Sequence, residues 1–154
     1  MKKKDFLESL SRFATGITII TLGNISKGFY GCTVNSFTSV SLVPSKILFC
    51  IDNKNSFLNK FKKNTYLNIS ILSDKQKKLS NKFSSNPKIR WKSTSYILSN
   101  KEIPYFKESL VTLECILEKK INSGDHKIII CNFKKVINKN KGNPLIYFDR
   151  SYIS

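Results

Sequence analysis

Two long β-rich segments, residues 110–121 and 127–136, dominate the second half of the sequence. Val, Ile, Leu and Cys recur through both segments between polar residues, which is the pattern of strands rather than helices. The five residues between them read Asn-Ser-Gly-Asp-His, and the pair Gly124-Asp125 is typical of the tip of a hairpin. The sequence therefore predicts one long antiparallel hairpin.

Shorter strand patterns precede and follow this hairpin, at residues 17–22, 29–34, 47–51, 66–72 and 144–148. Helical spacing of apolar residues predicts short helices at 5–14, at 55–64, and from a cap at Asp74 through Phe83. Strands and helices do not alternate as they would around a parallel sheet. We therefore expect a mainly β fold, a closed or nearly closed antiparallel barrel with short peripheral helices, formed by one domain over residues 1–154.

The chain is strongly basic, with 27 Lys and Arg against 10 Asp and Glu and a net charge of +17. A nucleic-acid-binding protein would concentrate these charges on one element or face. Here the lysines are scattered among many asparagines and isoleucines, which indicates a coding bias toward A and T. A basic nucleic-acid-binding barrel stays open as the weaker alternative, and no specific nucleic acid is expected.

Cysteines and the N-terminus give two further expectations. Cys32, Cys50, Cys115 and Cys131 are widely spaced, without a C-x-x-C pair, so buried free thiols are expected and no metal site. The start Met1-Lys2-Lys3-Lys4 is not followed by the apolar segment of a signal peptide, and no apolar run reaches transmembrane length. A cytoplasmic protein without a membrane partner is expected.

Residues 31–52 read as the end of one strand, a polar connection and a buried strand, and the connection carries almost no charge despite the basic chain. Small hydrogen-bonding side chains follow one another there: Thr33, Asn35, Ser36, Thr38, Ser39 and Ser41. Such a segment could surround a ligand with many hydrogen-bonding edges, or it could be an ordinary polar crossover.

Most catalytic machinery is missing from the sequence. His126 is the only histidine, the ten acidic residues form no convincing pair, and there is no G-x-S-x-G motif. A Ser-His-Asp set assembled in space stays open. If the protein is an enzyme, a cofactor is expected to supply the chemistry while the protein supplies binding and orientation.

Several motifs, in order along nearly the whole chain, resemble the flavin reductase-like family. The main one is Gly31-x-Thr-Val-Asn-Ser-Phe-Thr-Ser-Val-Ser-Leu-x-Pro44. The others are Phe13-Ala-Thr-Gly-Ile-Thr-Ile-Ile-Thr21, Leu67-Asn-Ile-Ser-Ile-Leu72, Gln76-x-x-Leu-Ser80 with Phe83, Gly124-Asp-His126, and Pro144-Leu-Ile-Tyr147 with Arg150 and Tyr152.

The resemblance implies an FMN-binding split antiparallel β-barrel with Greek-key connections, usually a homodimer. It implies NAD(P)H-dependent reduction of FMN or FAD, with the reduced flavin passed to a partner flavin-dependent monooxygenase. Hydride transfer between two stacked rings needs little acid–base machinery, which agrees with its scarcity here. A flavin-binding split-barrel protein without catalysis is the alternative.

The matched motifs also imply roles for individual residues. His126 is the expected catalytic residue, beside the flavin and the incoming nicotinamide. Lys82 is the expected phosphate cation, and Ser56 and Phe57 at a helix start would approach the phosphate. Arg150 with Tyr147 or Tyr152 would hold the dinucleotide. The remaining expected cofactor contacts are Thr33, Val34, Asn35, Ser36, Ser39, Val40, Cys50, Ile51, Asp52 and Phe83.

For three of these residues, an ordinary structural role is the alternative. His126 could be an exposed hairpin residue, Lys82 a solvated charge of a lysine-rich helix, and Ser56 a helix N-cap.

Overall fold

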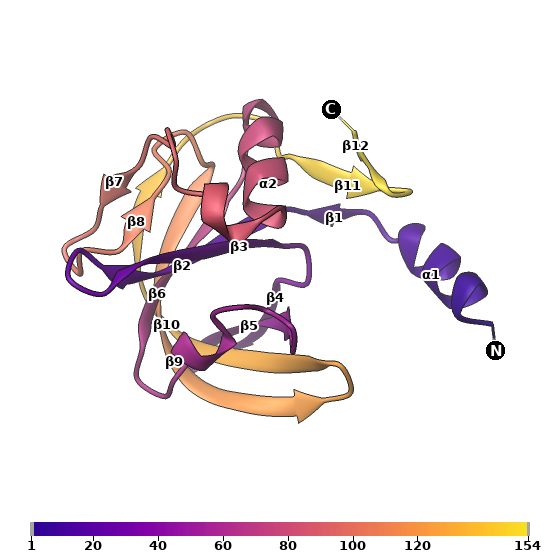
Figure 1. The fold of residues 1–154 in the computed structure, drawn as a ribbon, viewed down its shortest axis with the longest axis horizontal. Coiled ribbons are helices and arrows are strands. Elements are labelled where there is room, and N and C mark those ends of the chain that lie inside the picture. Colours follow the sequence, from indigo (N-terminus) through magenta and orange to yellow (C-terminus); the bar gives the residue numbers. More distant parts are fainter. Residues whose placement is uncertain (1, 154) are drawn as a thin grey trace.

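A seven-stranded antiparallel sheet forms the body of the computed structural model, which describes residues 2–153 (Figure 1). Its strands follow the order β3-β2-β6-β9-β10-β5-β4. Their bounds are β2 Thr18–Asn24, β3 Gly28–Val34, β4 Thr38–Leu42, β5 Ser45–Asp52, β6 Tyr66–Ile71, β9 Val111–Ser123 and β10 His126–Lys139. The predicted long hairpin is confirmed as β9–β10, and the fold is mainly β and antiparallel.

The sheet curls into a barrel that stays split between β3 and β5. The edge strands β3 and β4 each have a ladder partner on one side only. Ser36 bridges the split instead, because its hydroxyl accepts the Cys50 N–H at 2.8 Å and donates to the Cys50 carbonyl at 3.3 Å. One side chain thus joins the connection after β3 to β5, at a place where no backbone ladder is formed.

Alternation along the strands fills the barrel with apolar side chains. On β5, Ile47, Phe49 and Ile51 face the interior while their neighbours face outward. Phe57 and Phe61 pack beside them, with ring centroids 5.8 Å apart. Fully burying one such side chain contributes about 1.5–3 kcal/mol, so this cluster is the main source of stability.

A second apolar cluster lies outside the barrel under α2 (Lys77–Ser84). It contains Ile19 of β2, Phe83 of α2 and Phe106. Because β2 is covered on both faces, all of its first five residues are buried, whereas a half-exposed strand would alternate.

Helices are fewer than the sequence pattern predicts. The helix expected at 55–64 is wrong: only a single 3-10 turn, Leu58–Lys60, forms there. The Asn55 side chain accepts the Phe57 N–H at 3.0 Å, which favours a turn over a continuing helix. The second helix begins through Ser73, whose N–H donates to Gln76 Oε1 at 3.0 Å, rather than through Asp74.

The polar connection within residues 31–52 contains one strand that the sequence did not predict, β4. It pairs with β5 through an irregularity between Ser39 and Ser41, which disrupts the period-two pattern that identifies strands. Residues 84–101 are irregular, as expected, apart from the 3-10 turn Pro87–Ile89 and the short strand β7 (Ile97–Leu98), which pairs with β8 (Pro104–Tyr105).

The N-terminal helix α1 (Lys3–Ser11) projects from the barrel beside the C-terminal hairpin of β11 (Ile146–Phe148) and β12 (Ser151–Ile153) (Figure 1). This hairpin pairs with β1 (Thr15–Gly16) in a small separate sheet. No residue of α1 is buried, although it carries Phe6, Leu7 and Leu10. Within residues 2–153, no helix is long and apolar enough to cross a membrane.

Candidate functional site

A cavity of about 300 Å³ opens at the split, between the end of β3 and the end of β5. The structure brings many of the predicted residues to its wall: Thr33, Val34, Asn35, Ser36, Cys50, Ile51, Asp52, Phe83 and His126. Cys32, Asn55, Ser84 and Arg90 also line it, and the sequence did not predict them. The two strands therefore assemble one site from segments that are distant in the sequence.

Hydroxyl groups of the polar connection mainly hold the frame of this cavity. Thr33 Oγ1 donates to the Ser80 carbonyl of α2 at 2.7 Å, and Ser36 bonds Cys50 across the split. Asn35 differs, because its side-chain amide forms no hydrogen bond in the described part of the chain. Among the polar motif residues that line this cavity, Asn35 is thus the one whose side chain is open to a ligand.

Among residues 2–153, Arg90 is the only cation that is buried at this site. It is 8% exposed, and its Nη1 donates to the Gly31 carbonyl at 2.7 Å. Its Nε and Nη2 donate to the Ser85 carbonyl at 3.1 and 2.6 Å. A guanidinium has five N–H donors, so these three bonds leave donors for a ligand.

The charge of Arg90 has no acidic partner among residues 2–153. Burial lowers the pKa of the guanidinium, which still stays protonated because arginine starts so far above neutral pH. Burial also raises the pKa of the neighbouring Cys32 thiol to about 12, so Cys32 is neutral. An uncompensated buried cation of this kind favours an anion.

Gly31 explains how β3 reaches Arg90. A Cβ at this position would lie 2.7 Å from the Phe83 ring and 3.2 Å from the Trp91 ring. The strand can therefore approach α2 only without a side chain here, and its carbonyl then accepts the Arg90 bond.

A smaller neighbouring cavity of about 250 Å³ shares Arg90 with the first. Ser56, Phe57, Tyr30 and Lys88 also line it. Phe57 is almost completely buried, and the Arg90 guanidinium lies 5.9 Å from its ring centroid. Ser56 and Phe57 thus lie near Arg90 but do not line the cavity at the split.

His126 stands at the start of β10, directly opposite Asp52 of β5. Its Nδ1 lies 2.7 Å from Asp125 Oδ1, and this hydrogen bond lowers the pKa of Asp125. Because an ionised carboxylate only accepts hydrogen bonds, Nδ1 carries the proton and Nε2 is left for a ligand.

Other predicted residues lie elsewhere. Ser39 and Val40 are exposed on β4 and line none of these cavities. Tyr147 and Arg150 line a separate cavity of about 520 Å³ under α1, which shares Asn35 with the split. Lys82 faces the opposite side of α2, where its ammonium group donates to the Lys92 carbonyl.

One signal in the sequence could have identified Arg90. The chain has 27 basic residues, yet only three of them are arginines. An arginine kept in so lysine-rich a chain indicates a position where the planar, multi-donor guanidinium is needed.

The family model for the flavin reductase like domain matches residues 10–154. The chain belongs to this family. The match extends over the barrel, the split with its cavity, α2 and the C-terminal hairpin.

Three curated relatives agree with this membership. A probable flavin reductase from Rhizobium meliloti is 32% identical over 80% of the chain, which spans only 40% of that protein's length. The reductase component of 4-hydroxyphenylacetate 3-monooxygenase from Thermus thermophilus is 28% identical, covering 97% of the chain and 95% of the relative. The FMN reductase (NADH) SmoA from Agrobacterium fabrum is 30% identical, covering 94% and 81%.

Among solved structures, the flavin reductase PheA2 in its native state superposes with a TM-score of 0.86 at 28% identity. The superposition covers 99% of this flavin reductase-like chain and 97% of PheA2. The split barrel with its peripheral helices is therefore the fold of this family.

Proposed function

We propose that the protein is an NAD(P)H:flavin oxidoreductase that transfers hydride from a reduced nicotinamide to FMN or FAD. The observation that carries this proposal is the family match over residues 10–154. The cavity at the split adds local support, because it combines a buried cation without an acidic partner with polar groups on two adjacent strand edges.

The residues of the cavity fit a flavin phosphate and ring edge. Arg90 would bind the phosphate through its remaining N–H donors, with Ser56 beside it in the neighbouring cavity. Asn35 and the β5 residues Cys50 to Asp52 would contact the ring edge. Bound flavin supplies the hydride acceptor, and the protein's task is to hold and orient the two rings.

His126 would position the nicotinamide through Nε2, since Asp125 occupies Nδ1. We expect His126→Gln to raise the KM for the nicotinamide more than it lowers kcat, because hydride transfer needs no proton from this side chain. Equal KM values for variant and wild type would remove this role.

The decisive experiment follows absorbance of the reduced nicotinamide after purified protein is mixed with FMN or FAD. Flavin-dependent loss of the absorbance is expected. If neither NADH nor NADPH is consumed with either flavin, the proposal fails. A yellow protein without turnover would instead favour the non-catalytic flavin-binding alternative.

NADH is the hydride donor that we propose, because the Agrobacterium relative is named an FMN reductase (NADH). The reduced flavin would then serve a partner monooxygenase, as the name of the Thermus relative indicates for that protein. Comparison of kcat/KM for NADH and NADPH tests the first point. A higher value for NADPH would reverse the assignment.

A homodimer is part of the same proposal. The apolar side chains of α1 lie exposed, and the β4–β5 connection exposes Leu42 and Val43, the latter at 94%. A second copy of the chain could cover these groups. Light scattering coupled to size exclusion should give the mass of a dimer, and Phe6→Ser/Phe13→Ser should give a monomer.

A cytoplasmic location completes the proposal. All four cysteines are free, which agrees with a reducing compartment. Reduced nicotinamides are also cytoplasmic substrates. Fractionation of cells that express the tagged protein tests this location, and recovery outside the cytoplasmic fraction would contradict it.

A further inference from the structure

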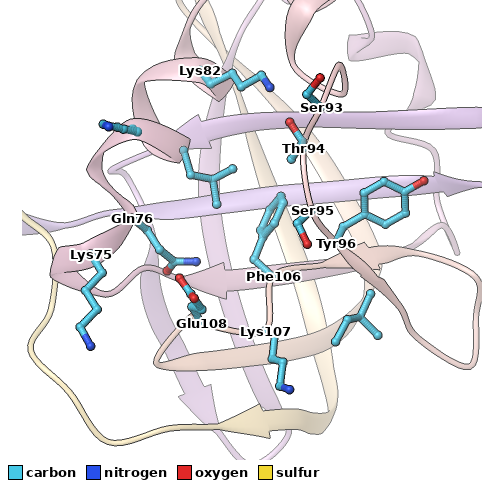
Figure 2. A pocket seen from close by; sticks show the side chains of 13 residues that line it. Lys75, Gln76, Lys82, Ser93, Thr94, Ser95, Tyr96, Phe106, Lys107 and Glu108 are labelled. Atoms are coloured by element: carbon cyan, nitrogen blue, oxygen red, sulfur yellow. The ribbon is translucent and has the colours of Figure 1, made fainter.

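A different cavity lies against α2, and four lysines are among the residues that line it (Figure 2). This cavity holds about 510 Å³, within the range of small-molecule sites. None of its lining residues belongs to the two cavities of the proposed flavin site. It is formed by α2 and the turn before it, by the loop 93–97 and by residues 106–108.

Lysines surround this cavity. Lys75, Lys78 and Lys82 follow one another at spacings of three and four residues, which places them on one side of the helical segment. Lys107 stands across from them, and Figure 2 shows Lys82 above the cavity with Lys75 and Lys107 below it. None of these four lysines forms an ion pair within residues 2–153.

Residues 75 to 82 extend over roughly 10 Å, given a rise of 1.5 Å per residue. That span exceeds a single phosphate group and matches an extended anion.

The wall opposite α2 is aromatic and firmly supported. Phe106 is almost fully buried and stacks on Trp91 at a centroid distance of 6.4 Å. Tyr96 is 38% exposed, and its ring meets Trp91 at 5.7 Å and Phe29 at 5.3 Å. The cavity therefore offers a fixed apolar surface that a flat ring could contact.

Gln76 adds an unfilled donor. The residue is only 5% exposed, and its Oε1 accepts the Ser73 N–H at 3.0 Å. The amide nitrogen, turned toward Glu108 and the cavity in Figure 2, forms no hydrogen bond in the described part of the chain. This nitrogen reaches the cavity, so it can donate a hydrogen bond to a ligand oxygen there.

Glu108 restricts the class of ligand. Its carboxylate lies among the lysines and would repel a simple inorganic anion. A carboxylate is, however, the usual acceptor for ribose hydroxyls. Ser93 and Ser95, whose hydroxyls form no hydrogen bond among residues 2–153, offer further polar contacts.

We propose that this cavity binds a nucleoside diphosphate. The lysines and the Gln76 amide would contact the phosphates, Glu108 the ribose, and Tyr96 the base. This site is separate from the proposed flavin cavities, because they share no lining residue. The ligand could be a free nucleotide or the ADP half of a dinucleotide.

Titration calorimetry of the full chain with ADP tests the proposal. ADP should bind at low ionic strength, and saturation with FMN should leave its affinity unchanged. Displacement of ADP by NADH would identify the dinucleotide as the source, and no displacement would identify the free nucleotide. Absence of ADP binding, or its displacement by FMN, would overturn the proposal.

Matched variants locate the ligand. Lys75→Gln/Lys107→Gln should weaken both ADP and pyrophosphate by about tenfold or more, through lost charge-assisted hydrogen bonds. Lys27→Gln/Lys134→Gln removes the same charge from exposed positions elsewhere and should change affinity by less than about twofold. Equal losses of affinity in the two double variants would mean that the overall charge of the protein alone attracts these anions. That result would overturn the proposed site.

Glu108→Gln separates a nucleoside diphosphate from a plain anion. It should weaken ADP, because the ribose loses its acceptor, and strengthen pyrophosphate, because a repelling charge is gone. Tyr96→Ser should weaken ADP and leave pyrophosphate unchanged. If Glu108→Gln strengthens ADP and pyrophosphate alike, the nucleoside assignment is wrong.

Discussion

On one side of α2, a single arginine, 8% exposed, is fixed by bonds to two backbone carbonyls; on the other, four lysines surround a wider cavity open to solvent. The buried guanidinium is desolvated and has no acidic partner, so its attraction for an anion is weakly screened. The four lysines form no ion pair among residues 2–153 and line an open cavity, so water screens each charge and their effect on an anion is collective. The burial of a cation, more than the local number of cations, should therefore determine how strongly it contributes to binding.

Arg90→Met tests the buried side and should give the largest change. The variant loses charge-assisted bonds to the phosphate, worth about 1.5–3 kcal/mol, so FMN should bind about 10- to 100-fold more weakly. Flavin fluorescence titration measures the change. Circular dichroism identifies any loss of fold, because the carbonyls of Gly31 and Ser85 also lose a donor.

Arg90→Lys is the matched control for this prediction. It keeps the charge but loses the planar fork, so its FMN affinity should lie between those of Arg90→Met and the wild type. An Arg90→Met protein that is folded and binds FMN normally would show that the buried cation serves structure alone.

Alkaline pH should lower the free energy of unfolding, because it ionises buried thiols, among them Cys32 beside Arg90. Burial raises the pKa of Cys32 and of Cys115 to about 12 from 9.0. The folded state thus holds these protons more tightly than the unfolded chain does. Stability is complete below pH 9 and falls as the pH rises toward 12, by roughly 1.4 kcal/mol per thiol at pH 10.

Urea unfolding under reducing conditions at pH 8 and pH 10 measures this loss. Cys32→Ala should show a smaller fall in the free energy of unfolding than the wild type, because one titrating thiol is absent. The same fall in both proteins would contradict the assignment to Cys32.

Thr33→Val tests how firmly β3 is joined to α2 on the buried side. It removes the hydrogen bond from Oγ1 to the Ser80 carbonyl at little change in shape, so stability should fall by about 0.5–1.5 kcal/mol. FMN affinity should fall only a few-fold. Thr38→Val, on the exposed strand β4, is the control and should unfold at the wild-type urea concentration.

Lys82→Gln tests the open side and should give the smallest effect on flavin. Lys82 lines the cavity away from the split, so FMN affinity should change by less than about twofold, as for a solvated charge. A loss of FMN affinity comparable to that of Arg90→Met would identify Lys82 as the phosphate-binding cation. It would contradict the proposed difference between the two sides of α2.

The sequence predicts the barrel well and the site unevenly. The long hairpin is clear because its residues meet neighbours close in the chain, and the predicted segments 110–121 and 127–136 correspond to β9 and β10. Arg90 lies in an irregular segment without periodicity, and its partners Gly31 and Ser85 are set by tertiary folding. Nothing local in the sequence could show that these groups meet.

The polar connection also shows what the sequence alone does not determine. Its composition indicates hydrogen bonding but not the partner of each hydroxyl. The Thr33 and Ser36 hydroxyls bond the protein itself, whereas the Asn35 side chain between them forms no hydrogen bond among residues 2–153. The helix expected at 55–64 fails for a related reason, since Phe57 and Phe61 are spaced for a helix but held by the barrel core.

Ser36 has a consequence for how fast a ligand could enter and leave. The Ser36 hydroxyl, rather than a backbone ladder, joins the connection after β3 to Cys50 of β5, so opening the cavity mouth there would break two side-chain hydrogen bonds and no strand pair. Exchange of the ligand is thereby separated from unfolding of the barrel. An enzyme that must release its ligand after each turnover would benefit from a stable barrel whose binding cavity is closed by the hydrogen bonds of one side chain.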